Sequence, residues 1–402
     1  MVRELQYIDL FAGCGGISLG LYKSGLQGLF AVEHSPDAFS TLQYNLIQRN
    51  NHFDWPDWLP INHLNINDLL KTHRDNLIKL QGQVDLVVGG PPCQGFSLVG
   101  QRRESDERNK LIHSYLNFVE LVQPSVILFE NVQGFTVKFP GEKGKNKIAY
   151  SEIVIKRLHD LGYSDAHGEM IDMSEYGVPQ RRKRFLVIAT RENLSNAIFS
   201  QLEIGNKIFL QEKGLSAKNS VSDALSDLER INGERNCPDT PRFMSGILSS
   251  PNTSLQKYLR VLNSKGHVPD SHRFVNHTPE IKEIFNCLLE KAPRNKRIWG
   301  EEKDIYGIKK RNVTVLDPDE PSLTITTIPD DFVHYSEPRV MTVRECARLQ
   351  TFPDWFEFKG RYTTGGDRRT KQTPRYTQVG NAVPPLFSEQ LGLAIKQVLS
   401  ND

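Results

Sequence analysis

A cysteine stands directly after two prolines in VVGGPPCQGFS, residues 87–97. Pro91 and Pro92 fix the backbone φ angle and cannot continue a hydrogen-bonded strand, so they make a stiff turn that presents Cys93 in one direction. Free cysteines are more often buried, unreactive side chains, and we expect that role for the other four, Cys14, Cys237, Cys287 and Cys346. The proline and glycine neighbours of Cys93 instead favour a nucleophile.

A carboxyl group ends the next apolar run, VILFENV at residues 126–132, in the form of Glu130. Cys93 follows one expected strand and Glu130 lies at the end of the next, at the carboxyl edge where doubly wound sheets bind their ligands. A carboxyl group beside a thiol can act as an acid or as a hydrogen-bond donor. A solvated strand end is the alternative for a single glutamate, but here two strand ends carry complementary chemistry.

A glycine-rich turn follows the first apolar run, in IDLFAGCGGISLG at residues 8–20. It leads into a helix whose free N–H groups favour a polar or anionic ligand. The turn departs from the dinucleotide pattern G-x-G-x-x-G, because Ser18 stands in place of the third glycine. The next run ends at Glu33, where a carboxylate can accept hydrogen bonds from both hydroxyls of a ribose. Together these features predict a nucleoside-bearing cofactor; the alternative is a glycine turn near an ordinary surface glutamate.

Basic residues follow one another in QRRKRF, residues 180–185. On an extended strand Arg182 and Arg184 share one face and alternate with Arg181 and Lys183. The pattern also fits a solvated basic strand or a nucleic-acid patch. The apolar run FLVIAT that begins at the end of this segment favours a strand that enters the core.

These residues require a frame of alternating strands and helices over the first 190 residues. Short apolar runs predict strands, and longer patterns of helical period predict the helices between them. The alternation predicts an α/β fold with a doubly wound, mostly parallel sheet. The expected strands lie at 7–11, 29–33, 84–90, 126–131 and 185–190, and the expected helices at 41–50, 111–122 and 150–161.

After Thr190 the pattern becomes polar and irregular up to about residue 338, which predicts a second, smaller domain. Regular patterns return at 343–352 and in a C-terminal helix at 383–399. We place a catalytic and cofactor-binding domain at 1–190 plus 376–402, and the second domain with a hinge segment at 191–375.

The composition sets limits on the function. A chain of 402 residues is long enough for two domains, and its formal net charge of +2 gives no overall field for a nucleic acid, so any such surface is local. No apolar run is long enough to span a membrane and the N-terminus lacks a signal-peptide core, so we expect a cytoplasmic protein. The five cysteines include no CxxC pair, and we expect neither a disulfide framework nor a metal.

The motifs resemble those of the DNA (cytosine-5)-methyltransferases, in the order of that family. DLFAGCGG resembles its cofactor loop, GPPCQGFS its nucleophile turn and ENV its base-holding carboxyl group, and QRRKRF resembles its paired arginines; RECARLQTFP and QVGNAVPP resemble two closing motifs. The resemblance covers nearly all of the chain outside the variable middle. It implies an S-adenosylmethionine-dependent methyltransferase sheet and a target-recognition domain in the second domain.

The resemblance also implies roles for the catalytic residues. The Cys93 thiolate adds to C6 of a cytosine, which turns C5 into a nucleophile. Glu130 holds N3 and the exocyclic amine, Arg182 steadies O2 of the base, and Arg184 steadies Glu130.

For the cofactor, S-adenosylmethionine, the resemblance implies contacts from several parts of the chain. Two positions depart from the family: His34 stands where an aromatic residue is common, and Asn65 where an aspartate is usual, with Asp68 as an alternative counterpart. The implied cofactor-binding residues are Asp9, Phe11, Gly13, Gly15, Glu33, His34, Asn65, Ile66, Pro91, Leu111, Asn381 and Val383.

A cytosine inside duplex DNA must be swung out before it can react. The implied DNA contacts are Ser97, Gln101, Arg103 and Thr324. The basic segment 359–377, with Tyr362 and Tyr376, suits phosphate contacts. A cognate restriction endonuclease that acts on the same site without a stable complex, and a freestanding methylase, both fit; we expect a monomer.

Three other functions each fit part of the sequence. An RNA methyltransferase of the same family is the closest, but its CFT tripeptide is absent and the long variable domain favours duplex DNA. A NAD-linked oxidoreductase would need the third glycine that Ser18 replaces. An inactive DNA-binding regulator would not need Cys93 and Glu130.

Overall fold

The computed structural model describes residues 4–92, 110–138, 149–260, 266–364 and 372–400. The chain divides into two compact units. The first unit consists of Met1–Asp172, Lys183–Asn206 and Ser388–Asp402, and the second of Met173–Arg182 and Lys207–Phe387. The chain passes from the first unit to the second after residue 206 and back after residue 387, which is 16 and 12 residues beyond the predicted boundaries at 190 and 375. A ten-residue segment before β7, Met173–Arg182, also groups with the second unit.

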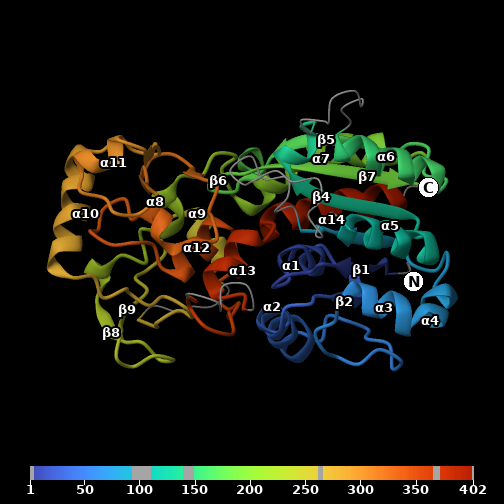
Figure 1. Cartoon of the computed structure of the whole chain (residues 1–402), viewed down its shortest axis with the longest axis horizontal. Coiled ribbons are helices and arrows are strands. Elements are labelled where there is room, and N and C mark those ends of the chain that lie inside the picture. The colour runs from blue at the N-terminus through green and yellow to red at the C-terminus, as the bar shows by residue number, and fades with distance from the viewer. Residues whose placement is uncertain (1–3, 93–109, 139–148, 261–265, 365–371, 401–402) are drawn as a thin grey trace. The chain divides into compact units, whose positions relative to one another are not determined.

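A central sheet, six-stranded over the described residues, forms the frame of the first unit (Figure 1). The strand order is β2-β1-β3-β4-β7-β5. The pairs among β1 to β4 are parallel, whereas β7 is antiparallel to both of its neighbours. The strands are β1 (Gln6–Leu10), β2 (Gln27–Val32), β3 (Leu86–Gly89), β4 (Val126–Val132), β5 (His167–Asp172) and β7 (Lys183–Thr190). The predicted α/β fold with a mainly parallel sheet is confirmed.

The sequence located five of these strands but not β5, and it did not predict the direction of β7. The segment HGEMID of β5 is mostly half-buried or exposed, so it shows no apolar run. Only ten residues separate the end of β5 at Asp172 from the start of β7 at Lys183. Parallel neighbours need a crossover of a dozen or more residues, so this short connection fits an antiparallel pair.

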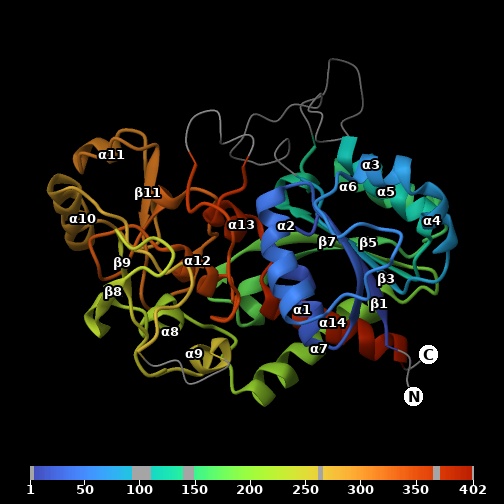
Figure 2. The same ribbon diagram turned by 90° about the horizontal axis from the view of Figure 1, so that it is seen from below.

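Helices cover both faces of the sheet (Figure 2). The helices α3 to α6 pack on one face, and they enclose the large apolar core with the strands. On the other face α14 contacts α1 through the Lys23–Glu389 ion pair and α7 through the Gln201–Gln397 hydrogen bond. The helices are α1 (Gly16–Lys23), α2 (Pro36–Leu42), the π-helix η1 (Gln43–Arg49), α3 (Ile66–Thr72), α4 (Arg74–Lys79), α5 (Lys110–Val122), α6 (Tyr150–Asp160), α7 (Ser195–Lys213) and α14 (Pro385–Ser400).

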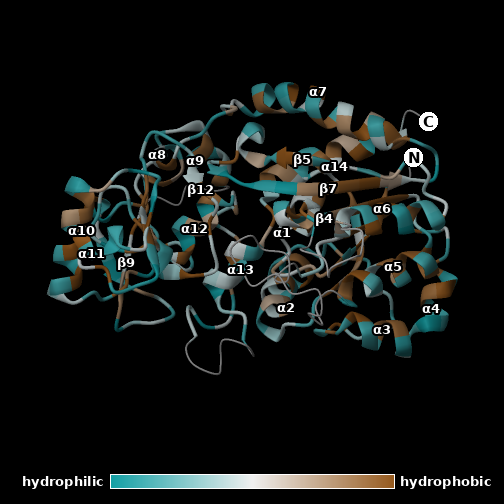
Figure 3. Ribbon diagram, turned by 45° about the horizontal axis from the view of Figure 1, so that its top comes forward, coloured by the Kyte–Doolittle hydropathy of each residue, from teal (hydrophilic) through white to brown (hydrophobic). Residues whose placement is uncertain are grey.

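The 19-residue helix α7 lies in a region whose pattern looked irregular. Ile204 and Ile208 on this helix are 61% and 54% exposed, so the apolar residues do not form one stripe. The alternating teal and brown along α7 in Figure 3 shows the same mixture, whereas β7 becomes hydrophobic after its first residues.

The second unit consists of small sheets and short helices. Its three-stranded sheet has the order β10-β11-β13, and β12–β6 and β8–β9 form two-stranded sheets. The elements are β6 (Gln180–Arg181), α8 (Val221–Leu225), β8 (Glu234–Asn236), β9 (Met244–Gly246), α9 (Ser254–Leu259), α10 (Pro279–Lys291), β10 (Arg297–Trp299), α11 (Glu302–Ile305), β11 (Asn312–Val315), β12 (Ser322–Leu323), β13 (Phe332–Val333), α12 (Val343–Leu349) and α13 (Arg375–Asn381).

The segment QRRKRF is not the single strand that the sequence predicted. β6 ends at Arg181 and pairs with β12, whereas β7 begins at Lys183 in the central sheet. Arg182 lies between them and groups with the second unit, while Arg184 groups with the first. The alternation of burial is nevertheless present, because Arg181 and Lys183 are exposed and Arg182 is buried.

Within the described residues, no helix combines the length and the apolar character that crossing a membrane would require. The same residues contain no group of three or more histidine, cysteine or acidic side chains that could hold a metal ion.

Candidate functional site

The ends of β3 and β4 meet as the sequence predicted. Cys93 lies outside the described residues, whereas Gly90 and Pro91 before it lie within them. Asn131 Nδ2 donates to the carbonyl oxygen of Pro91 over 3.3 Å. A Cβ atom at Gly90 would lie 2.8 Å from Glu130 Oε2, so a glycine is needed for the carboxyl group to pack there. The turn that leads to Cys93 is therefore fixed against Glu130 and its neighbour.

Arg184 is the cation beside Glu130. Its Nε atom is 2.8 Å from Glu130 Oε1, and the two side chains are 12% and 13% exposed. Among the described residues Oε1 has no aligned hydrogen-bond donor, because the Arg184 N–H is not directed at it. The pair is thus a close charge contact in which one carboxyl oxygen can still accept a hydrogen bond.

Arg182 is 1% exposed and belongs to the second unit. Its Nη2 atom donates to the carbonyl oxygens of Gly380 (3.2 Å) and Asn381 (3.5 Å), at the end of α13. A cation is favourable there because the last carbonyl groups of a helix lack partners within it. The Asn381 side chain is exposed and Val383 is buried.

The glycine turn after β1 adopts left-handed backbone at three positions, Phe11 (φ 60°), Gly13 (φ 57°) and Gly15 (φ 92°). Glu33 fixes this turn from the end of β2. Its Oε2 atom accepts the N–H of Gly13 (2.9 Å) and its Oε1 atom accepts the N–H of Ser35 (2.7 Å). A Cβ atom at Gly13 would meet no described atom within 4 Å, so this side of the turn is open.

His34 contacts the same carboxylate. Its Nδ1 atom is 3.1 Å from Glu33 Oε1. The hydrogen bond to Glu33 raises the pKa of His34 above its usual value. The residue that departs from the family pattern is therefore an ion-pair partner of Glu33 when it is protonated.

The segment around Asn65 reaches the end of β2, because the N–H of Leu64 donates to the carbonyl oxygen of Glu33 over 2.8 Å. Asn65 caps α3, and its Oδ1 atom accepts the N–H of Asn67 (2.8 Å). Ile66 is buried, whereas Asp68 is exposed in the first turn of α3.

Two further residues on the cofactor list, Pro91 and Leu111, differ in burial. Pro91 is buried. Leu111 is half-buried in the first turn of α5 and packs against the core.

Asp9 is 1% exposed, so it lies beneath the turn and not on its surface. Ser18 Oγ donates to Asp9 Oδ2 over 2.5 Å. Burial raises the pKa of Asp9 to about 7. Sequence reasoning did not place Ser18 or Asn131 in the site. The sequence feature that could have pointed to Ser18 is its position in place of the third glycine of the G-x-G-x-x-G pattern.

The predicted DNA contacts are placed only in part. Ser97, Gln101 and Arg103 lie outside the described residues. Thr324 is half-buried just after β12, and its Oγ1 atom donates to the carbonyl oxygen of Arg181 over 2.7 Å.

Two tyrosines expected to contact phosphates are buried instead. Tyr362 donates to Asp239 over 3.0 Å, and Tyr376 donates to the carbonyl oxygen of Met341 over 2.7 Å. Both side chains are 5% exposed or less, so their expected role as phosphate contacts is wrong.

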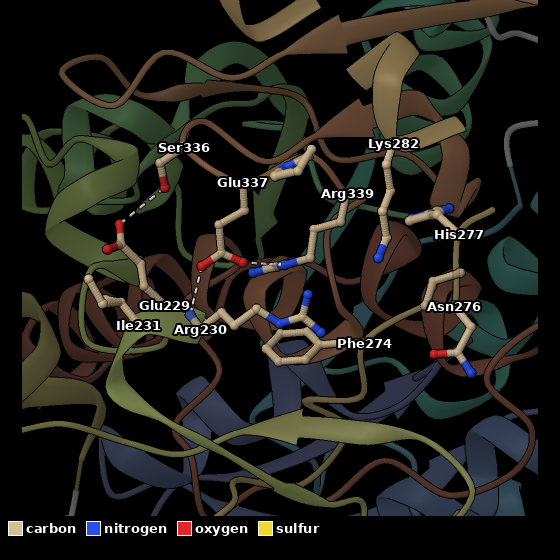
Figure 4. Close-up of a pocket in the computed structure, with 12 residues that line it drawn as sticks. Glu229, Arg230, Ile231, Phe274, Asn276, His277, Lys282, Ser336, Glu337 and Arg339 are labelled. Carbon is tan, nitrogen blue, oxygen red and sulfur yellow. Dashed lines mark hydrogen bonds and ion pairs between the residues drawn. The ribbon is translucent and has the colours of Figure 1, made fainter. Parts of the chain in front are cut away.

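A cavity of about 680 Å³ lies within the second unit (Figure 4). None of the predicted site residues in the described chain lines it. Its acidic side chains already have partners, since Glu337 accepts from Arg339 Nε and from the N–H of Arg230 (both 2.6 Å), and Glu229 accepts from Ser336 Oγ. The cavity therefore lacks the chemistry found at the ends of β1 to β4.

Four described cysteines are consistent with the unreactive role expected for them. Cys14, Cys237 and Cys346 are buried and Cys287 is half-buried, and no disulfide joins any of these four described cysteines. Burial raises the pKa of Cys14 to about 12, which keeps it protonated.

Comparisons with known proteins agree with this arrangement. Residues 5–397 match the family model for the C-5 cytosine-specific DNA methylases. The type II methyltransferase M1.HphI of Haemophilus parahaemolyticus is 29% identical over 404 residues, which cover 99% of this chain and 88% of that protein. M.DdeI of Desulfomicrobium norvegicum is 28% identical over 410 residues, with 99% and 90% covered.

A solved structure has the same fold over the whole chain. It is a candidate DNA modification methyltransferase encoded within a prophage of E. coli, with a TM-score of 0.66, 25% identity, and 99% of this chain and 100% of that chain covered. Because the family match spans nearly the entire sequence, the chain belongs to the C-5 cytosine-specific DNA methylases, which use S-adenosylmethionine.

Proposed function

We propose that this DNA cytosine-5 methyltransferase acts on a cytosine that has swung out of duplex DNA, through a transient bond between the Cys93 sulfur and C6 of the ring. The single observation that supports this most is the position of Glu130. Its carboxyl group packs against Gly90, three residues before Cys93, and lies beside Arg184 with one oxygen still able to accept a hydrogen bond. Such a group suits the N3 and amine edge of cytosine.

The proposed chemistry begins with the thiolate. Its sulfur forms a bond to C6, and the electrons of the C5–C6 double bond move toward C5 and N3. Glu130 shares its proton with N3 as charge develops there, and Arg184 stabilises the carboxylate that remains. S-adenosylmethionine, when bound, supplies the methyl group that C5 takes. A base then takes the C5 proton, the electrons of the C5–H bond restore the C5–C6 double bond, and the C6–S bond breaks to release the thiolate.

The cofactor site fits a nucleoside with a positively charged sulfur. Two backbone N–H groups hold the Glu33 carboxylate at the end of β2, where it can bind a ribose. The open side of Gly13 lets a ligand approach the backbone. In this proposal Phe11 packs on the adenine, and the segment at Asn65 and Ile66 lines the same site.

We further propose that the second unit provides the target-recognition domain, and that Ser97, Gln101, Arg103 and Thr324 contact the DNA. Arg182 steadies the base, and Asn381 with Val383 closes over the cofactor. The curated relatives are named as type II methyltransferases, which supports a role as the modification enzyme of a restriction-modification system. The partner in that system is an endonuclease that cuts the same sequence.

The test is to trap the covalent bond. DNA that contains 5-fluorocytosine at the target should become attached to the wild-type protein, because fluorine at C5 blocks the final elimination. Cys93→Ala should bind S-adenosylmethionine normally but form no adduct and transfer no methyl groups. The matched control is Cys287→Ala, which removes a half-buried thiol and should behave as the wild type does. Methylation by Cys93→Ala at a near-normal rate would refute the mechanism.

A further inference from the structure

Asp9 and Ser18 form a buried pair at the base of the glycine turn. Asp9 is the last residue but one of β1, and Ser18 is in the first turn of α1. Their exposed fractions are 1% and 0%, and Ser18 Oγ donates to Asp9 Oδ2 over 2.5 Å. A short hydrogen bond to a carboxyl group is among the stronger ones in proteins. It joins the strand before the turn to the helix after it.

A second bond from β1 holds the same residue of α1. The hydroxyl of Tyr7 donates to the carbonyl oxygen of Ser18 over 3.3 Å, and it also lies 2.6 Å from His52 Nε2. The first residues of α1 have no side-chain cap, since Gly15 occupies that position. Ser18 is thus fixed to β1 by both its side chain and its backbone.

The turn between these residues needs such support. Phe11 has a Cβ atom, so its left-handed backbone is unfavourable and persists only where the surroundings impose it. Glu33 holds the middle of the turn through the N–H of Gly13. The Asp9–Ser18 bond holds its two ends.

We propose that Asp9 and Ser18 are positioning residues for the cofactor, whose bond keeps the turn at residues 11–15 in the conformation that receives S-adenosylmethionine. This inference depends on the proposed role of that turn in binding the cofactor. Neither side chain reaches the surface, so both act through Phe11 and Gly13. Serine in place of the third glycine then has a purpose, because a glycine there could not bond to Asp9.

The charge of Asp9 provides a readout that a purely structural bond would lack. Burial raises the pKa of Asp9 to about 7, the hydrogen bond from Ser18 acts in the opposite direction, and the charge of Glu33 raises it further. Among the described residues, the titratable groups that face Asp9 are Tyr7, Cys14, Glu33 and Tyr115. Burial raises the pKa values of Tyr7, Cys14 and Tyr115, so these three stay protonated between pH 6 and 8.

Ionisation of Asp9 should therefore favour the cationic sulfur of the cofactor as the pH rises through about 7. Loss of the Ser18 hydroxyl removes the bond that favours ionised Asp9, so the midpoint of this pH dependence should move upward.

The experiment measures the dissociation constant of S-adenosylmethionine by titration calorimetry on the full-length protein, from pH 6 to 8. Ser18→Ala should weaken binding about tenfold or more and shift the midpoint to higher pH. Asp9→Asn keeps an acceptor for the serine but carries no charge, so from pH 6 to 8 it should bind the cofactor as the wild type does with Asp9 protonated, without the gain in affinity at higher pH. In steady-state assays Ser18→Ala should raise KM for the cofactor more than it lowers kcat.

Ser24→Ala is the matched control. Ser24 is a buried serine just after the same helix, and its hydroxyl donates to the carbonyl oxygen of Leu21 over 2.8 Å. The proposal is overturned if Ser18→Ala binds as Ser24→Ala does, or if Asp9→Asn keeps the wild-type pH profile. If Ser18→Ala does not fold, the pH profile of Asp9→Asn still tests the proposal. If the wild-type protein itself shows no binding, the proposed cofactor site fails instead.

Discussion

The two units use charged side chains in opposite ways. In the first unit Glu130 and Arg184 lie close together at the end of a strand, partly exposed, with one carboxyl oxygen lacking an aligned donor. In the second unit Arg348 is fully buried and donates to Asp227 (3.0 Å) and Asp354 (2.6 Å). A charged pair with unused hydrogen-bonding capacity is available to a ligand, whereas a saturated pair supports the fold. A charged motif can therefore be assigned a role only when the partners of its side chains are known.

The motif RECARLQTFP illustrates this. This segment resembles a closing motif of the methyltransferase family. Its charged side chains Arg344, Glu345 and Arg348 are nevertheless all 0% exposed. Glu345 accepts from both Nη atoms of Arg339 and also completes the capping box with Thr342 at the start of α12. In the second unit this motif therefore serves as internal scaffold.

The largest effect is expected when the Glu130 carboxyl group, which is paired with Arg184, is replaced by an amide. Glu130→Gln should lower kcat by about 10²–10⁴-fold, because an amide cannot share a proton with N3 of the base. The melting temperature should change little, since this carboxyl group is half-buried and only partly bonded. Transfer of labelled methyl groups to DNA of mixed sequence, together with a thermal melt, checks both.

The matched control for that experiment is Glu120→Gln. Glu120 also belongs to the first unit and pairs with Arg157 over 2.8 Å, but the two side chains are 49% and 42% exposed. Its activity should equal that of the wild type. A Glu130→Gln protein that keeps more than about a tenth of wild-type activity would place the acid elsewhere.

Sequence alone predicted the parts of the site that follow from strand ends. Buried strands show themselves as apolar runs, and parallel strands bring their ends together, so the neighbourhood of Pro91, Glu130 and Glu33 could be anticipated. The structure agrees through the Asn131–Pro91 and Gly13–Glu33 bonds.

Other features had no local signal. The partner of Arg182 at the end of α13 is about 200 residues away along the chain, and burial of Tyr362 and Tyr376 depends on the fold of the second unit. A basic segment with tyrosines looks the same in sequence whether those rings face solvent or the core. The Asp9–Ser18 bond was likewise hidden, although the missing glycine marked its place.

A smaller effect is expected from breaking the saturated pair. Arg348→Met keeps much of the side-chain volume but removes one of the two cations that Asp227 and Asp354 share, so that only Arg260 remains. The loss should lower the free energy of unfolding by about 3–5 kcal/mol. Urea titration followed by tryptophan fluorescence measures it. Arg181→Met is the control, because its ion pair with Glu320 is about half exposed and should contribute only about 0–1 kcal/mol. Equal losses from both variants would contradict the comparison.

The smallest expected effect is a difference between the units in acid. In the second unit burial lowers the pKa of His272 to about 4 and that of His334 to about 3. Both are below the ordinary 6.5, so the unfolded unit binds more protons and its stability is lost as the pH falls below about 6.5.

In the first unit the lowered pKa of His52, about 4, acts in the same direction. The pKa of Asp9 is raised to about 7 from an ordinary 3.8 and has the opposite effect. Between these two pH values the folded unit binds a proton that the unfolded unit does not, so acidification stabilises the first unit through Asp9. The two largely cancel between pH 7 and 5. Acidification over this range should therefore weaken the second unit by on the order of 3 kcal/mol more than the first.

Two double variants separate the units by fluorescence. The variant with Trp55→Phe and Trp58→Phe keeps Trp299 and Trp355, whose fluorescence reports unfolding of the second unit. The variant with Trp299→Phe and Trp355→Phe keeps Trp55 and Trp58, which report unfolding of the first unit. With each reporter, urea midpoints are compared at pH 7 and pH 5. A larger loss of stability in the first unit than in the second would show that Asp9 is not protonated in the folded protein at pH 5. The proposed difference between the raised pKa of Asp9 in the first unit and the lowered histidine pKa values in the second would then be wrong.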